Sequence, residues 1–145
     1  MATVNDILAT KGSQVYTIGK TATVLDGALE MTKHKVGALV VTDDGKVAGI
    51  FTERDVLRRV VTERRDPATT TIAAVMTAEI VCCTPATPIE EARGTMKNRR
   101  IRHLPVISND GRLMGLISIG DLNAHEATAQ EQTIHLLQEY MYGRT

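Results

Sequence analysis

The chain has 145 residues, and its 17 basic and 17 acidic side chains give a formal net charge of zero. A domain of this length buries enough surface to fold without a disulfide or a bound metal. The lack of a basic excess disfavours a general nucleic-acid binder, and the 3% of aromatic residues, with no Trp, disfavours platforms that stack bases.

The first half of the chain predicts alternating strands and helices. In chain order we expect a lead-in turn at residues 4–8, a strand at 15–18, a helix at 24–31, strands at 36–41 and 47–51, and a helix from residue 52. Thr23 is the expected N-cap of the first helix, with Asp26 in its first turn. The Asp44-Gly45 dipeptide between two apolar runs predicts a hairpin turn.

The second half repeats this order. We expect a lead-in turn at residues 72–76, a strand at 80–83, a helix at 89–96, strands at 102–107 and 113–118, and a helix from residue 118. Matched residues are 65 positions apart before the hairpin turn, as in Val24 and Ile89, and 66 apart after it, as in Gly49 and Gly115. A turn tolerates one inserted residue. Each half is therefore one copy of a strand–helix–strand–strand–helix unit.

Composition sets the boundaries of the copies. Residues 62–71 are charged and then rich in Pro and Thr, which predicts a linker, so copy 1 spans residues 1–66 and copy 2 spans residues 67–124. Residues 125–145 continue an amphipathic helix whose stripe of Ile134, Leu137 and Met141 suits dimer or core packing better than a membrane. Units this small cannot each bury a sheet, so we predict an α+β fold of two repeats, packed sheet to sheet around one core with pseudo-twofold symmetry. Pro105 indicates an edge strand or a strand end.

Both copies place a hydroxyl and a carboxylate at the same strand-to-helix junction, Gly-x-x-[Thr/Ser]-x-x-Asp. One interpretation is helix capping, with Thr52 as N-cap and Asp55 closing a capping box, worth about 1 kcal/mol. The other is ligand binding, because a helix N-terminus suits phosphate and a carboxylate accepts hydrogen bonds from vicinal hydroxyls such as those of ribose. Repetition at matched positions favours binding without excluding capping.

The order of elements, the VGALVV and RHLPVI strands before an Asp-Gly turn, and the repeated junction resemble the cystathionine-β-synthase (CBS) domain family. Together the copies resemble a stand-alone tandem CBS pair over residues 4–124. The resemblance implies two clefts between the repeats that bind adenosine ligands such as AMP, ADP, ATP, NAD(H) or S-adenosylmethionine, with no metal beyond nucleotide-associated Mg. It implies a non-enzymatic cytoplasmic sensor, a homodimer that signals to an unidentified protein partner by conformational change.

The resemblance also implies roles for individual residues. It implies that Asp55 and Asp121 bind the ribose and that Thr52 and Ser118 contact the ribose or the phosphate. It also implies that Ile50 and Leu116 line the adenine. It implies that Arg102 and His103 bind the phosphates in the Thr52 cleft, and that Arg54 supplies a basic group to the opposite cleft. Their counterparts are uncharged: Gly37 and Ala38 match Arg102 and His103, and Gly120 matches Arg54. We therefore expect the two clefts to differ in affinity or in ligand.

Other signals leave alternatives open. The basic cluster at residues 97–103 suits a solvated helix end, a phosphate site or, least, nucleic acid. Cys82 and Cys83 are adjacent and close no useful loop, which favours structural roles in a reducing compartment. A redox enzyme that uses NAD(H) at either cysteine is the rival hypothesis, and a structural interaction module with empty clefts is a third. The four histidines form no spaced metal set, and no apolar run reaches the roughly 18 residues of a membrane span.

Overall fold

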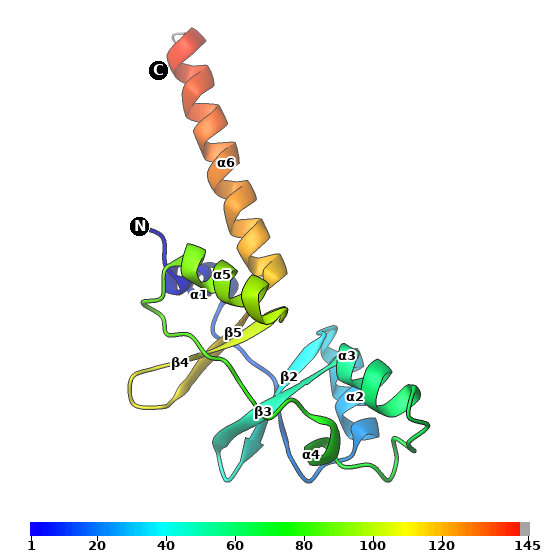
Figure 1. Cartoon of the computed structure of the whole chain (residues 1–145). Coiled ribbons are helices and arrows are strands. Elements are labelled where there is room, and N and C mark those ends of the chain that lie inside the picture. Colours follow the sequence, from blue (N-terminus) through cyan, green and yellow to red (C-terminus); the bar gives the residue numbers. More distant parts are fainter. Residues whose placement is uncertain (143–145) are drawn as a thin grey trace.

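The structure, a computed structural model, describes residues 1–142, and it describes the side chains of these residues except those at 135 and 139–142. The chain forms two lobes, each built from a small sheet and helices, and a long helix projects from one of them (Figure 1). The elements are, in chain order, α1 (Val4–Lys11), β1 (Thr17–Gly19), α2 (Val24–His34), β2 (Ala38–Asp43), β3 (Lys46–Thr52), α3 (Glu53–Asp55), the wide-turned helix η1 (Val56–Val61), α4 (Ile72–Val75), α5 (Ile89–Arg99), β4 (His103–Ile107), β5 (Leu113–Ser118) and α6 (Ile119–Tyr142). This order confirms the predicted α+β fold of two repeats.

The first repeat is built on a three-stranded sheet in the order β1-β2-β3. β1 pairs with β2 in parallel, and β2 pairs with β3 in antiparallel orientation. Helix α2 begins at the predicted cap: the Thr23 hydroxyl accepts a hydrogen bond from the Asp26 N–H, and the Asp26 carboxylate accepts one from the Thr23 N–H, both at 3.1 Å. These two bonds satisfy backbone donors that an uncapped helix start leaves unpaired.

The second repeat has a two-stranded sheet, β4-β5. The prediction of a strand at residues 80–83 is therefore wrong. Only Cys83 remains in register, bridging Val106 in parallel. Pro105 is the physical reason. In the first repeat the Val40 N–H donates to the Tyr16 carbonyl at 3.1 Å, but the matched residue, Pro105, has no N–H, so the ladder loses that bond.

The two hairpin turns explain why the repeat interval changes from 65 to 66. Asp44 and Gly45 form a two-residue loop in which both φ values are positive, 50° and 78°. Such a loop matches the natural twist of a hairpin. In the second repeat the Ser108 N–H donates to the Arg112 carbonyl at 2.9 Å around a three-residue loop, in which only Gly111 has positive φ, 85°. The extra residue therefore lies in the turn, as predicted.

The lead-in helices are exchanged between the repeats. Helix α1 precedes the first repeat in sequence, yet Val4, Ile7 and Leu8 pack in the core of the second. Helix α4 packs Ile72 and Val75 in the core of the first. The prediction of one shared core is wrong, because each small sheet buries its apolar face beneath the helix of the other repeat and so forms its own core. The first core contains Val24, Met31, Leu39, Val41, Phe51 and Val60, and the second contains Cys83, Ile89, Ala92, Met96, Leu104, Val106, Ile117 and Leu122.

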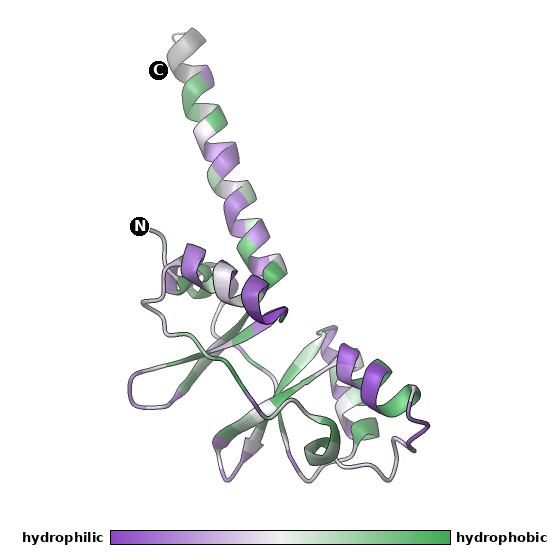
Figure 2. Ribbon diagram, viewed as in Figure 1, coloured by the Kyte–Doolittle hydropathy of each residue, from purple (hydrophilic) through white to green (hydrophobic). Residues whose placement is uncertain are grey.

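The last helices of the two repeats differ from each other. After α3, helix η1 has wide turns in which the Thr62 N–H donates to the Leu57 carbonyl, five residues back, at 3.2 Å. Helix α6 continues past the second repeat with mixed polar and apolar side chains (Figure 2). Ile134 and Leu137 of the predicted stripe are exposed, and the Met141 side chain lies outside the described ones. None of the helices in residues 1–142 is long and apolar enough to cross a membrane.

Candidate functional site

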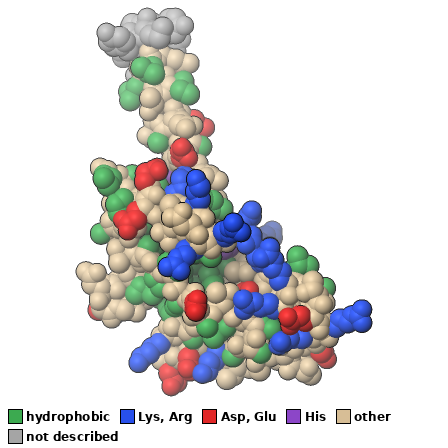
Figure 3. Space-filling model, in the orientation of Figure 1, with side chains coloured by type: hydrophobic (Ala, Val, Ile, Leu, Met, Phe, Trp, Pro, Cys, Tyr) green, Lys and Arg blue, Asp and Glu red, His purple; other side chains and the backbone are tan. Residues whose placement is uncertain are grey.

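A cavity of about 410 Å³ lies between the repeats, large enough for a small-molecule ligand. Lys and Arg side chains gather around a hollow between the lobes (Figure 3). The cavity takes residues from the first repeat, from the segment after α4 and from the start of β4: Gly37, Ile50, Thr52, Glu53, Arg54, Asp55, Arg58, Arg59, Thr77, Glu79, Ile80, Val81, Arg100, Ile101, Arg102, His103 and Pro105.

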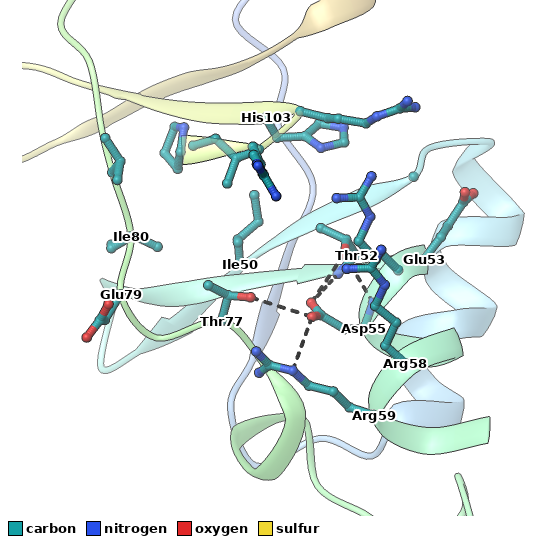
Figure 4. Close-up of a pocket in the computed structure, with 17 residues that line it drawn as sticks. Ile50, Thr52, Glu53, Asp55, Arg58, Arg59, Thr77, Glu79, Ile80 and His103 are labelled. Atoms are coloured by element: carbon teal, nitrogen blue, oxygen red, sulfur yellow. Dashed lines mark hydrogen bonds and ion pairs between the residues drawn. The ribbon is translucent and has the colours of Figure 1, made fainter. Parts of the chain in front are cut away.

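The Thr52–Asp55 junction forms one wall of the cavity and is also a helix cap (Figure 4). Asp55 Oδ2 accepts hydrogen bonds from the Thr52 N–H at 3.0 Å and from the Thr52 hydroxyl at 3.2 Å, and the Asp55 N–H donates to Thr52 Oγ1 at 3.3 Å. The capping interpretation is therefore confirmed. Capping uses Oδ2 and leaves the second carboxylate oxygen for other partners.

The second oxygen of Asp55 has weak partners. Thr77 Oγ1 donates to Oδ1 at 3.5 Å, and Arg59 Nε lies 3.9 Å from it. Burial, with 7% of the residue exposed, raises the pKa of Asp55, and the Thr52 N–H, Arg59 and the hydroxyls of Thr52 and Thr77 only partly offset that rise. Asp55 is thus a desolvated carboxylate with an under-used oxygen, which two hydroxyl donors of a ligand would satisfy.

Five arginines and three carboxylates line the cavity, which leaves two formal positive charges. Arg59 is held in place, because its Nη1 donates to the carbonyls of Val75 and Met76 at 3.1 and 2.9 Å. The other four guanidinium groups make no hydrogen bond or ion pair with any side chain that the structure describes, and all four belong to exposed residues: Arg54, Arg58, Arg100 and Arg102. Unpaired guanidinium groups around one cavity are suited to phosphate.

Two of these arginines were not predicted as individual site residues, although Arg100 belongs to the basic cluster at residues 97–103, for which a phosphate site was one alternative. Arg100 ends helix α5 in the left-handed conformation, with φ of 55°, which directs the chain back toward β4. Arg58 lies four residues after Arg54, and this spacing on a helix is the signal that would have indicated a shared face. Thr77 was also missed, since no local pattern connects the segment after α4 to the first junction.

The structure brings the predicted Arg102 and His103 to the Thr52 cavity. The Arg102 carbonyl accepts a hydrogen bond from the Ile119 N–H at 2.9 Å, as the matched Gly37 carbonyl does from the Glu53 N–H at 3.1 Å. His103 extends from β4 on the side of the cavity opposite Asp55 (Figure 4). Burial lowers the pKa of His103, and although Asp121 acts to raise it, Lys11, Arg102 and Arg54 lower it further. A neutral imidazole at this place offers one donor and one acceptor.

The remaining predicted residues of this cavity divide into lining and buried groups. Ile50 lines the cavity and pairs with Thr77 through two backbone hydrogen bonds of 3.0 and 2.9 Å. Gly37 also lines it, together with its counterpart Arg102, whereas Ala38 is buried in β2 at 4% exposure. Arg54 was expected to serve the opposite cleft, yet it lines this one.

The second junction has the same cap and a different partner. Asp121 Oδ2 accepts from the Ser118 N–H at 2.8 Å, and the Asp121 N–H donates to Ser118 Oγ at 3.1 Å. The Lys11 ammonium lies 2.8 Å from Asp121 Oδ2 and donates to the Leu116 carbonyl at 2.8 Å. Burial raises the pKa of Asp121. The hydrogen bond and positive charge of Lys11, together with the hydrogen bonds of Ser118, outweigh this effect and lower the pKa overall. Two of the residues predicted for this cleft, Leu116 and Asp121, therefore bind a lysine.

The pKa values of the two thiols are raised, whereas reactive cysteines have lowered ones. Burial, with the neighbouring Cys82, raises the pKa of the Cys83 thiol to about 12, and burial also raises that of Cys82. Since the thiolate is the reactive form, these environments disfavour nucleophilic or redox chemistry. The described residues contain no group of three or more His, Cys, Asp or Glu side chains that would hold a metal.

Comparison with known proteins agrees with this architecture. The family model of the CBS domain matches the chain twice, over residues 4–62 and 72–127. The mitochondrial CBS domain-containing protein CBSX3 of Arabidopsis thaliana is 35% identical over 97% of this chain and 72% of its own length. A solved protein with CBS domains from Burkholderia ambifaria MC40-6 is 39% identical, with a TM-score of 0.86 and coverage of 89% of this chain and 96% of that one. The CBS domain pair of protein MJ0100, solved with 5′-methylthioadenosine and S-adenosyl-L-methionine, shares the fold at 22% identity, a TM-score of 0.79 and coverage of 89% and 98%.

Proposed function

The chain belongs to the CBS domain family, as the repeated junction predicted, and on this premise we propose that it is a regulatory module that binds an adenine nucleotide with more than one phosphate. ATP and ADP are the ligands that suit the cavity best. The observation that carries this proposal is the set of four unpaired arginines around the cavity of Asp55. Binding of 5′-methylthioadenosine and S-adenosyl-L-methionine by a protein of the same fold supports the adenosine part.

The charge of the cavity selects among adenosine ligands. S-Adenosylmethionine carries a positive sulfonium, which the two excess positive charges disfavour. AMP has a single phosphate and can engage fewer of the guanidinium groups than ADP or ATP. NAD(H) carries two bridging phosphates with one charge each and a second ribose, which a cavity of about 410 Å³ accommodates less readily. The expected order of affinity is therefore ATP and ADP first, then AMP, NADH and S-adenosylmethionine.

In this proposal the side chains have distinct roles. Asp55 accepts hydrogen bonds from the ribose hydroxyls through its under-used oxygen, and the aliphatic side chain of Ile50 contacts the adenine. Arg58 and Arg102 approach the phosphates from different repeats, and Mg accompanies the nucleotide as it does in solution. His103, kept neutral, donates one hydrogen bond to a phosphate oxygen.

Nucleotide binding also supplies a signal. Arg54 and Arg58 come from the first repeat, and Arg100 and Arg102 come from the second, so like charges of the two repeats line the same cavity. A polyphosphate would neutralise this repulsion and bring the repeats closer, by no more than its difference in affinity for the two arrangements. An unidentified protein partner would sense that change.

Self-association is the second part of the proposal. Leu25 and Leu29 on α2, and Leu57 and Val61 on η1, are large apolar side chains that are 41–60% exposed. The matched residues of the second repeat, Glu90, Gly94, Asn123 and Ala127, present no such surface. We therefore assign the homodimer contact to the helices of the first repeat. Free Cys82 and Cys83 agree with a reducing compartment such as the cytoplasm.

Binding rather than catalysis is proposed, because the described partners of the Asp55 carboxylate are Thr52, Thr77 and Arg59, none of which is a base. Burial also raises the pKa of both thiols, which disfavours the thiolate. Isothermal titration calorimetry with ATP, ADP, AMP, NADH and S-adenosylmethionine tests this. ATP and ADP should bind most tightly, and Asp55→Ala should remove the binding. Equal affinity for S-adenosylmethionine would contradict the charge argument. No binding by any of the five would favour an interaction module with empty clefts, and NADH turnover lost in Cys82→Ser would favour the redox enzyme.

A further inference from the structure

The two junctions of the chain have the same capping backbone but different surroundings. The first lines a cavity, and the second is bound by a lysine. We propose that the Lys11 side chain fills the place where the second junction would hold a ribose, so that the chain takes one adenosine ligand and not two. This inference rests on the proposed function, because it concerns which of the two matched sites is open. It makes Lys11 the residue that determines the number of nucleotides bound.

Corresponding carbonyl groups at the two junctions have different donors. At the first junction the Ile50 carbonyl accepts from the Thr77 N–H at 2.9 Å. At the second, the matched Leu116 carbonyl accepts from the Lys11 ammonium at 2.8 Å. The same ammonium lies 2.8 Å from Asp121 Oδ2, so it spans the space between the strand and the helix start.

Helix length explains this difference. Helix α4 has four residues and ends at Val75, and the extended conformation of its C-cap, Met76 (ψ of 160°), leads into the backbone pairing of Thr77 with Ile50. Helix α1 starts at the matched position but has eight residues, and it ends at Lys11. The chain therefore presents a side-chain ammonium to the second junction in place of a backbone strand.

Matched contacts fix the alignment of the two helices. A Cβ atom at Gly49 would lie 2.9 Å from the Met76 sulfur, and a Cβ atom at Gly115 would lie 2.8 Å from Leu8, so Leu8 and Met76 occupy equivalent places. Three residues further along, Lys11 corresponds to Glu79. Glu79 is an acid and cannot form an ion pair with Asp55, which leaves the first junction open.

Lys11 neutralises the carboxylate that a ribose would need. Its side chain is 35% exposed and that of Asp121 is 23% exposed, so the pair is partly withdrawn from water. The Gly12 N–H donates to the Leu8 carbonyl at 2.8 Å and ends α1 beside the pair, which holds the lysine in place. Hydroxyl groups of a ligand would have to displace a hydrogen bond in which donor and acceptor are both charged, and they would leave the Lys11 ammonium without its carboxylate.

Equilibrium dialysis with labelled ATP tests the stoichiometry. The parent chain should bind one ATP per chain and the Lys11→Ala variant should bind two, the second more weakly. The matched control is Lys20→Ala, which removes an ion pair to Asp43 of 2.9 Å at a similar exposure, remote from either junction, and should still bind one. Lys11 is the last residue of α1, so Lys11→Ala leaves the buried Val4, Ile7 and Leu8 in place.

The outcomes are distinguishable. Two ATP molecules on the parent chain, or one on Lys11→Ala, would overturn the role of Lys11. No ATP on the parent would instead contradict the proposed function. A second measurement is independent of that result: the Lys11→Ala, Asp55→Ala double variant should bind uncharged adenosine, and adding Asp121→Ala should abolish this. A double variant that does not bind adenosine would overturn the inference.

Discussion

Asp55 and Asp121 occupy matched positions in two equivalent capping boxes, yet their pKa values shift in opposite directions. Burial dominates at Asp55 and raises its pKa, whereas Lys11 and the Ser118 cap outweigh burial at Asp121 and lower its pKa. Both carboxylates accept the N–H of the residue that caps the helix, at 3.0 and 2.8 Å, so capping does not distinguish them. The difference lies in the charged partner: Lys11 binds the Asp121 carboxylate, whereas Asp55 keeps an oxygen that the proposed ligand would use.

The first prediction follows from the raised pKa of Asp55. Because the folded state holds the Asp55 proton more tightly than the unfolded chain, stability falls as pH rises from the ordinary value of 3.8 through the raised pKa. Asp55→Asn removes this cost and keeps an oxygen for the Thr52 N–H. At pH 8 the melting temperature of Asp55→Asn should equal or exceed that of the parent, while ATP affinity falls about tenfold, the equivalent of one charge-assisted hydrogen bond.

Thermal melts between pH 4 and pH 8 check this. The advantage of Asp55→Asn should shrink as the pH falls, because protonation relieves the parent of the same cost. Asp26→Asn, in the exposed capping box of α2, is the matched control and should not affect ATP binding. A variant that is less stable than the parent at pH 8 and equal at pH 4 would show that the Asp55 charge stabilises the fold.

The second prediction concerns the unpaired arginines. Replacing Arg58 or Arg102 by Ala should weaken ATP binding about tenfold, and AMP binding less, because each guanidinium loses charge-assisted hydrogen bonds to phosphate. Adenosine, if it binds, should be unaffected. Arg112→Ala, in the second hairpin, is the control. The affinity of the parent for ATP should also fall when the salt concentration rises, whereas an equal effect of Arg102→Ala on adenosine would point to a structural role.

The sequence predicted the repeated junction well because its information is local. Thr52, Asp55, Ser118 and Asp121 lie within single strand-to-helix turns, and hydroxyl and carboxylate at that spacing allow both capping and binding. The sequence could also have predicted the absence of a strand before Cys83, because a proline in the neighbouring strand cannot donate a hydrogen bond to the ladder.

The exchange of α1 and α4 could not be predicted in the same way. Val4, Ile7 and Leu8 have the apolar spacing of a helix, but that spacing does not show which core receives them. The Lys11–Asp121 pair joins residues 110 positions apart and depends on this exchange, so no local pattern indicates it. Arg100 likewise reaches the cavity because α5 ends in a left-handed residue there, which the sequence of a basic cluster does not specify.

The third prediction tests how tightly the exchanged helices pack. A Cβ atom at Gly49 would lie 2.6 Å from the Thr77 backbone oxygen, which cannot move without breaking the pairing with Ile50. Gly49→Ala should therefore reduce the free energy of unfolding by about 1–3 kcal/mol, the usual range for overpacking. Gly115→Ala meets the flexible end of Leu8 at 2.8 Å and should cost less.

Gly94→Ala is the matched control for the third prediction. Apart from its chain neighbours and the backbone of its own helix, no described atom lies within 4 Å of a Cβ at Gly94. The residue is inside α5, so alanine should stabilise the chain by about 0.5–1 kcal/mol. Urea denaturation of the three variants measures these differences. If Gly49→Ala is as stable as the parent, the segment after α4 does not pack against β3 as described.

The fourth prediction concerns the proposed homodimer. Leu29 and Leu57 are 60% and 58% exposed on neighbouring helices of the first repeat, and a charge at either place should prevent a second copy from burying the surface. Leu29→Glu and Leu57→Glu should sediment as monomers under conditions in which the parent sediments as a dimer. The control is Gly94→Glu, at the position of the second repeat that matches Leu29. If Gly94→Glu separates the copies and Leu29→Glu does not, the contact lies on the second repeat; sedimentation of the parent as a monomer at all concentrations would exclude the dimer.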